Sequence, residues 1–182
     1  RWVTVPVAGP PVDVVQNAGS LVHADGAGVD RGWGRERGLA TEVAADVFAW
    51  CGGAVLLRSA YLRDVGLFHE PFFLYYEDTD LSWRGQARGW HYRYVPDAVV
   101  RHDHAGSSGT SSARFAHFNE RNRLLLLFRN APEPLVRREV AGHLRETLAM
   151  AARDTLGPLR RGARPRPVVA WRRLVALAAF AA

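Results

Sequence analysis

Hydrophobic and polar positions change their period several times along this 182-residue chain. Residues 1–42 keep no period, and their recurring Gly and Pro favour irregular structure. Apolar and β-branched residues then fill 43–50 and 54–58, which predicts two buried strands on either side of Cys51-Gly52-Gly53. The glycine pair would let a ligand or another backbone approach closely.

Helical signals follow the second predicted strand. Ser59 is a candidate N-cap for a short helix that Gly66 would end. A second helix is expected to begin near Asp78 or Thr79 and to end at Gly89. Residues 90–95 alternate with period two and predict a strand, and 99–101 read as a further short apolar strand.

The remainder of the chain predicts helices. Residues 113–130 form a long helical pattern that Pro132 would stop, and the apolar run 124–128 should be buried. Residues 134–155 predict an amphipathic helix, 157–167 an Arg/Pro/Gly linker, and 168–182 a last apolar and basic helix. Alternating helices and strands favour an α/β domain, which we place at 1–131, with a helical extension at 132–182.

Composition narrows the class of protein. A hydrophobic fraction of 48% argues against disorder, and a net charge of +6 would ordinarily indicate an anionic partner. The basic residues are all Arg, however, and the chain has neither Lys nor Ile, which is typical of a GC-rich genome. We therefore expect no nucleic-acid partner. One cysteine excludes a disulfide framework and favours the cytoplasm.

We find no signal peptide and no apolar run of about 20 residues that could span a bilayer. The chain starts at Arg1 without Met and stops in mid-pattern. We expect a piece of a longer protein.

Three carboxylates, Glu77, Asp78 and Asp80, crowd the start of the second predicted helix. As a helix start they need no function, because acids there favour the positive end of the dipole and Asp80 can pair with Arg84. A carboxylate held rigidly at a helix start can also act as a general base if it faces a cleft. The pattern alone leaves both interpretations open.

His102 and His104 follow the predicted strand at 99–101. Two ligands do not make a metal site, so the spacing of these histidines is weak evidence for a metal.

Ordered motifs then carry a resemblance that covers roughly residues 12–130. The chain resembles the C-terminal half of family 2 glycosyltransferases, and within them the bacterial rhamnosyltransferase-like branch. The motifs are CGGAVLLR (51–58), VGLFHEPFF (65–73), YEDTDLSWR (76–84), GW (89–90), VPDAVVRH (95–102), SS (107–108) and RNRLL (121–125).

This resemblance implies part of a GT-A fold and an inverting hexosyl or rhamnosyl transfer from a nucleotide-sugar to a glycan or lipid-linked acceptor, as in cell-wall or polysaccharide synthesis. It implies Asp78 as the catalytic base and His102, rather than His104, as a ligand of Mn²⁺ or Mg²⁺. It also implies an acceptor side and a donor side of the site. The acceptor side would hold Trp50, Tyr76 and Glu77, and the donor side Gly52 and Gly53.

One departure from the family matters. No Asp-x-Asp motif precedes the acidic stretch, so the nucleotide-binding half is missing and we expect this piece to be inactive alone. The main alternative is a degenerate segment that binds glycans without chemistry, through the aromatic residues Trp33, Trp50, Tyr75, Tyr76 and Trp90. A metal-dependent hydrolase built on His102, Asp103, His104 and Asp78 is a weaker one.

The last predicted helix allows a membrane contact. Trp171, Leu174, Val175 and Leu177 are apolar, and Arg172 and Arg173 are cationic. Such a helix could lie on the inner face of a membrane, or it could pack on the domain.

Overall fold

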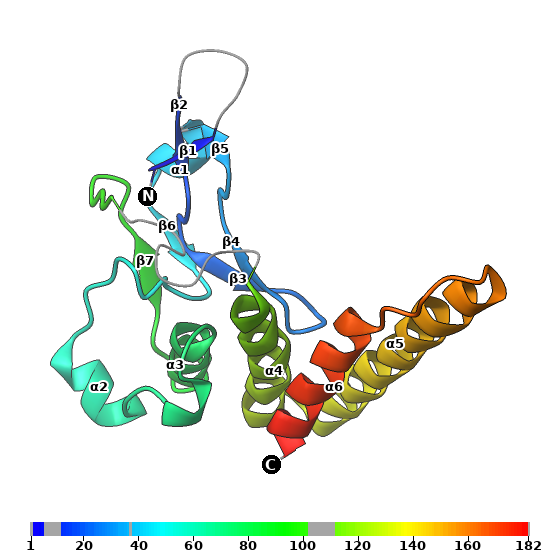
Figure 1. Ribbon diagram of the computed structural model, residues 1–182. Coiled ribbons are helices and arrows are strands. Elements are labelled where there is room, and N and C mark those ends of the chain that lie inside the picture. Colours follow the sequence, from blue (N-terminus) through cyan, green and yellow to red (C-terminus); the bar gives the residue numbers. More distant parts are fainter. Residues whose placement is uncertain (1, 6–11, 37, 102–111, 182) are drawn as a thin grey trace. The chain divides into compact units, whose positions relative to one another are not determined.

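The computed structural model describes residues 2–5, 12–36, 38–101 and 112–181 (Figure 1). The chain divides into two compact units, Arg1–Ser107 and Ser108–Ala182, and we describe each by itself. The described strands all lie in the first unit, and the second unit is helical. The structure is therefore mixed α/β, as the pattern predicted. The domain boundary between 131 and 132 stays a prediction.

The strands of the first unit are short and pair antiparallel. A three-stranded sheet has the order β1-β2-β5, β3 pairs with β4, and β6 pairs with β7. Their bounds are β1 Trp2–Val5, β2 Val12–Val15, β3 Ser20–Val22, β4 Gly28–Asp30, β5 Arg35–Glu36, β6 Ala45–Val47 and β7 Tyr92–Tyr94. A short helix, α1 (Leu39–Glu42), follows β5. The prediction of irregular structure over 1–42 is wrong, because strands of two to four residues leave no detectable period.

Two other strand predictions need correction. Only Ala45–Val47 of the predicted strand 43–50 is a strand, and it pairs with β7. Residues 54–58 and 99–101 form no strand, and Leu56 is 98% exposed. A strand requires a hydrogen-bonded neighbour, and none of the described segments lies beside these two.

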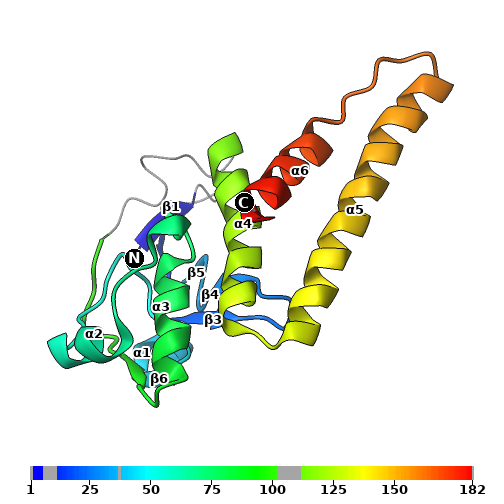
Figure 2. The same cartoon turned by 90° about the horizontal axis from the view of Figure 1, so that it is seen from below.

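Helices α2 (Ser59–Val65) and α3 (Glu77–Gln86) pack against each other, with a 3-10 turn, η1 (Glu70–Phe72), between them in sequence (Figures 1 and 2). Gly66 ends α2 at φ +90°, as predicted, but Arg58 rather than Ser59 is the N-cap. Helix α3 ends at Gln86, short of the predicted Gly89. The core beneath them contains Val47, Trp50, Tyr61, Val65, Leu81 and Tyr92.

The second unit consists of α4 (Ala113–Asn130), α5 (Glu133–Arg160) and α6 (Val168–Ala181), with α6 packed against both others (Figures 1 and 2). Helix α4 has the predicted bounds, and Ser112 caps it by accepting from the Phe115 N–H at 3.0 Å. Helix α5 continues through Pro158, so the predicted linker 157–167 is shorter. Phe128 is exposed rather than buried. No helix in the described ranges is both long and apolar enough to cross a membrane.

Candidate functional site: the start of helix α3

A strained turn leads into α3. Phe73, Tyr75 and Tyr76 have φ of 59°, 68° and 69°, although none is glycine. A left-handed conformation costs a side-chain-bearing residue roughly 1–2 kcal/mol, and such strain concentrates at functional sites. The turn sets the direction in which the chain enters α3, and Tyr76 is its N-cap residue. The first side chains after this strained turn are Glu77 and Asp78.

Asp78 is held by two segments of the chain. Its Oδ1 accepts from the Thr79 N–H at 2.7 Å and lies 3.2 Å from the Thr79 hydroxyl. Its Oδ2 accepts from the Gly52 N–H at 2.8 Å. A carboxylate has about four lone-pair sites, so Oδ2 keeps room for one more donor. Asp78 is therefore oriented, and one of its oxygens can still receive a proton.

The surroundings of Asp78 favour its protonated form. Burial raises the pKa of this carboxyl, although the N–H groups of Gly52 and Thr79 act in the opposite direction. A carboxylate with a raised pKa is a better proton acceptor, because general bases work best when their pKa lies near the working pH. The site thus combines fixed geometry with increased basicity.

The hydrogen bond from Gly52 is the last in a row that joins α3 to the segment after β6. Ser82 Oγ lies 3.4 Å from the Trp50 N–H, and Gln86 Nε2 donates to the Phe48 carbonyl at 3.1 Å. The row uses α3 positions four apart, which rise about 6 Å. Its partners are two residues apart in an extended segment, about 6.6 Å. The similar spacings fix the segment against the helix.

Ser82 and Gln86 were not predicted from the sequence as residues of the site. The available signal was the spacing of Asp78, Ser82 and Gln86 at i, i+4 and i+8, which places three polar side chains on one helix face.

Glu77 has a different environment from Asp78. Its Oε2 is buried and has no hydrogen-bond partner among the described residues. Burial raises the pKa of Glu77, and the charge of Asp78 raises it further. Adjacent carboxyls with raised pKa values are typical of functional sites, although structural ion pairs can also perturb them.

Asp80 has a structural role. Its carboxylate is fully buried and accepts from Arg84 Nε at 2.9 Å, which confirms the predicted pair. The Arg84 guanidinium also donates to the carbonyls of Val65 and Leu67, at 2.6 and 2.7 Å. This pair therefore anchors the end of α2 to α3.

The aromatic residues predicted to bind an acceptor have intramolecular contacts. Trp50 is 6% exposed and belongs to the core. The Tyr76 hydroxyl accepts from the Gly28 N–H at 3.1 Å. Trp90 packs edge-on against Tyr61 and donates to Asp64 at 2.7 Å. Because these three side chains are used within the protein, they offer less aromatic surface for the stacking that a pure glycan-binding segment would need.

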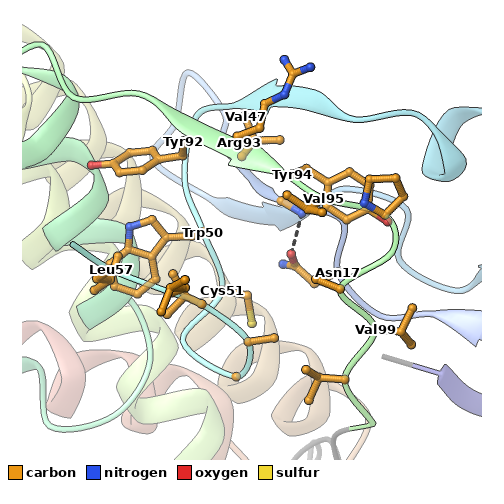
Figure 3. A pocket seen from close by; sticks show the side chains of 18 of the residues that line it. Asn17, Val47, Trp50, Cys51, Leu57, Tyr92, Arg93, Tyr94, Val95 and Val99 are labelled. Carbon is orange, nitrogen blue, oxygen red and sulfur yellow. Dashed lines mark hydrogen bonds between the residues drawn. The ribbon is translucent and has the colours of Figure 1, made fainter.

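A pocket of about 750 Å³ opens in the first unit (Figure 3). Its walls come from the β6–β7 pair, from residues 50–58 and from residues 95–100, with Asn17 at one side. The lining is mostly apolar and aromatic, which suits part of a ligand of ordinary size. The Asn17 side chain is fixed, since its Oδ1 accepts from the Gly19 N–H at 2.7 Å.

The pocket and Asp78 are joined through the glycine turn. Cys51 and Gly53 line the pocket, and Gly52 between them binds Asp78. Burial raises the pKa of the Cys51 thiol to about 11, so it stays protonated and unreactive at neutral pH. This cysteine is a wall of the pocket and not a nucleophile.

The metal prediction falls largely outside the described residues. His102, Asp103 and His104 lie in the range 102–111, which the structure does not describe. Within the described ranges, no group of three or more His, Cys, Asp or Glu could hold a metal ion. The described residues by themselves therefore do not fit a metal.

Comparison with known proteins defines the class. Residues 3–182 match the model of the family described as glycosyl transferase family group 2, and the chain belongs to this family. No solved structure matches the chain significantly.

Two curated relatives from Mycobacterium tuberculosis strains are similar over shorter stretches. An N-acetylglucosaminyl-diphospho-decaprenol L-rhamnosyltransferase is 46% identical over 66 residues, which cover 35% of this chain and 21% of the relative. A pre-mycofactocin glycosyltransferase is 47% identical over 51 residues, 28% of this chain and 11% of the relative. The chain thus spans about a fifth or less of either relative, and the resemblance found in the sequence is confirmed at the level of the family.

Proposed function

We propose that this chain supplies the acceptor-activating part of an inverting glycosyltransferase with a GT-A fold, in which Asp78 is the general base. The observation that carries the proposal is the oriented carboxylate at the start of α3. It is held by the N–H groups of Gly52 and Thr79, and its pKa is raised by burial. A side chain that served only as a helix cap would not need the bond to Gly52.

The proposed reaction is a single displacement at the anomeric carbon of the donor sugar. The acceptor hydroxyl donates a hydrogen bond to Asp78 Oδ2 and transfers its proton there. The oxygen attacks the anomeric carbon of the donor from the face opposite the nucleotide diphosphate. The new glycosidic bond forms as the bond to the diphosphate breaks, and the diphosphate leaves with the electron pair. The configuration at the anomeric carbon inverts.

Other residues would position the two substrates. Glu77, whose buried Oε2 has no hydrogen-bond partner in the part of the chain that the structure describes, would bind a second hydroxyl of the acceptor. Trp50, which lines the pocket, and Tyr76 would complete the acceptor side. The Gly52-Gly53 turn would lie against the donor sugar, because glycines allow close approach.

A divalent Mn²⁺ or Mg²⁺ would neutralise the charge that develops on the leaving diphosphate. We propose His102 as a ligand of this ion. His102→Ala should raise the metal requirement of the full-length parent more than His104→Ala. A stronger effect of His104→Ala would instead assign the ligand to His104.

The names of the relatives suggest the substrates. By similarity to the mycobacterial rhamnosyltransferase, we propose rhamnosyl transfer from a nucleotide-sugar to a lipid-linked acceptor in the synthesis of a cell-wall polysaccharide. Such a reaction would take place in the cytoplasm, at the inner face of the membrane.

The test compares Asp78→Asn with Asp46→Asn in the full-length parent. Asp46 is a matched control because its exposed carboxylate pairs, among the described residues, with Arg93 on the surface. Turnover of Asp78→Asn should fall about 10²- to 10⁴-fold, the usual contribution of a general base. Asp46→Asn should keep parental turnover. Near-parental turnover in Asp78→Asn would leave the carboxylate as a helix cap and favour the glycan-binding alternative.

A further inference from the structure

Helix α6 turns one charged side chain toward the bundle, beside the buried Ala170 and Ala176. Its arginine at position 173 points inward and is only 13% exposed. Within the second unit this guanidinium donates to Glu120 Oε1 at 2.8 Å and to Thr147 Oγ1 at 3.0 Å, and it lies 3.1 Å from His143 Nδ1. A charged side chain thus fixes the rotation of α6 against α4 and α5.

The network around Arg173 is well compensated. Burial by itself would raise the pKa of Glu120, but the hydrogen bond with His143 and the charge of Arg173 outweigh it and lower that pKa. The Glu120 carboxylate is therefore ionised and paired with the arginine. The rotation of α6 is determined by this pairing, so the side chains on the opposite face must point away from the bundle.

The opposite face of α6 has exposed apolar side chains beside the exposed Arg172. Val168, Trp171 and Val175 are 52%, 66% and 41% exposed, at spacings i, i+3 and i+7. Helix α5 likewise buries polar side chains, His143 and Thr147, and exposes apolar ones, Leu144 and Leu148. A helix of a soluble protein ordinarily has the opposite pattern, with apolar residues inward. Exposed apolar stripes of this kind mark interaction surfaces.

Arginines gather beside this apolar face. The turn between α5 and α6 encloses an open hollow of about 630 Å³, lined by Pro158, Arg161, Ala163, Arg164 and Arg166, with Asp154 at its edge. Asp154 pairs with Arg153 at 2.8 Å. Arg161, Arg164 and Arg166 are exposed and have no carboxylate partner among the described contacts. The hollow is therefore a cluster of uncompensated positive charge.

The sequence extends this charge asymmetry. Residues 155–182 contain no Asp and no Glu, and every charged side chain there is an arginine. An apolar stripe with an exposed tryptophan next to clustered arginines matches a lipid interface, where indole rings lie at the level of the headgroups. Phosphates of anionic lipids complement the arginines. A nucleic acid would use the arginines but not Val168 or Val175.

We propose that the outward face of α6 and the arginine-lined turn before it dock on an anionic lipid surface. Trp171 and the two valines enter the interface, and Arg161, Arg164 and Arg166 bind lipid phosphates. The proposal goes beyond the transferase function and does not depend on it, because it concerns other residues in the other unit.

The test uses the whole chain and sedimentation with vesicles of phosphatidylcholine, alone or with phosphatidylglycerol added. The chain should bind the mixed vesicles, and salt should weaken the binding. The triple variant Arg161→Gln, Arg164→Gln, Arg166→Gln should bind roughly a hundredfold less, about fivefold for each arginine. Arg63→Gln, which changes an exposed arginine of α2, is the matched control and should bind like the parent.

A second variant tests the apolar face. Trp171→Ser should lower vesicle binding severalfold and leave the thermal midpoint unchanged, since the ring is exposed. Brominated lipid should quench part of the tryptophan fluorescence of the parent. This part of the quenching should be absent in Trp171→Phe. The proposal is overturned by vesicle binding that neither variant weakens, or by arginine-dependent binding of an oligonucleotide in place of vesicles. Saturation by inorganic phosphate without vesicle binding overturns it, as does a lipid-independent dimer that Trp171→Ser abolishes.

Discussion

Gly52 donates its backbone N–H to Asp78 Oδ2 at 2.8 Å, across 26 positions of sequence. Gly52 is also the second residue of a tight turn that the Ala54 N–H closes on the Cys51 carbonyl at 3.0 Å. The turn and the start of α3 are thus joined through one carboxylate oxygen. This bond makes Asp78 more than a local helix cap, and it can be removed without touching Asp78.

Gly52→Pro removes that N–H and should keep the turn, because proline suits the second position of such a turn. The Gly52 N–H lowers the pKa of Asp78, so its loss should raise that pKa further. The base works when deprotonated. We therefore expect the acid limb of kcat/KM in the full-length parent to move to higher pH, with the rate falling most on the acid side of the profile.

Gly52→Ala is the control for this prediction. It keeps the N–H, and its Cβ would lie 3.5 Å from Asp78 Oδ2, an ordinary contact. The pH profile of Gly52→Ala should match that of the parent. Equal profiles for the proline and alanine variants would show that the N–H of Gly52 does not tune the base.

Glu77→Gln tests the cost of the buried carboxyl beside Asp78. Burial raises the pKa of Glu77 above its ordinary 4.5 in the folded protein. A raised folded pKa adds stability below the unfolded pKa and loses it as pH rises through the folded pKa. The thermal midpoint of the parent should therefore fall relative to that of Glu77→Gln as pH rises from about 4 to neutrality. A difference that stays constant with pH contradicts the assignment.

Local signals in the sequence predicted the helical elements well. Gly66 ends α2 and Pro132 follows α4 because capping and helix breaking depend on single residues. The strands were predicted poorly, because pairing depends on a distant partner. The segment 54–58 has the composition of a strand, yet among the described residues it has no strand beside it.

The candidate site could be located from sequence, but its geometry could not. The motif around Asp78 indicated a carboxylate at a helix start, and the structure places it there. The bond to Gly52 required the fold, because no spacing rule relates the two residues. The same limit applies to Trp50, which the resemblance assigned to the acceptor side and which the structure packs in the core.

Asp80→Asn should destabilise the protein by about 1.5–3 kcal/mol, because it weakens charged hydrogen bonds of a buried group. An exposed helix pair at this spacing contributes only about 0.2–0.5 kcal/mol, but the Asp80 side chain is fully buried. Glu133→Gln is the matched control, since Glu133 pairs with Arg137 at the same spacing on the surface. That change should cost at most about 0.5 kcal/mol. Denaturant unfolding measures both variants, and equal losses would contradict the role of burial.

Gly85→Ala should destabilise the protein by about 1–3 kcal/mol, the usual effect of overpacking a core. An added Cβ would lie 2.7 Å from Tyr61 Cε2 and would overlap the Tyr92 hydroxyl. Gly142→Ala in α5 is the control, because nothing lies within 4 Å of its added Cβ and the residue is inside a helix. That variant should gain about 0.4–1 kcal/mol.

The Tyr92→Phe change removes the overlapping hydroxyl, so a double-mutant cycle with Gly85→Ala should show a favourable coupling of about 0.5 kcal/mol or more. Additive effects in that cycle, or a stabilised Gly85→Ala variant, would mean that α3 does not depend on close approach to these two tyrosines.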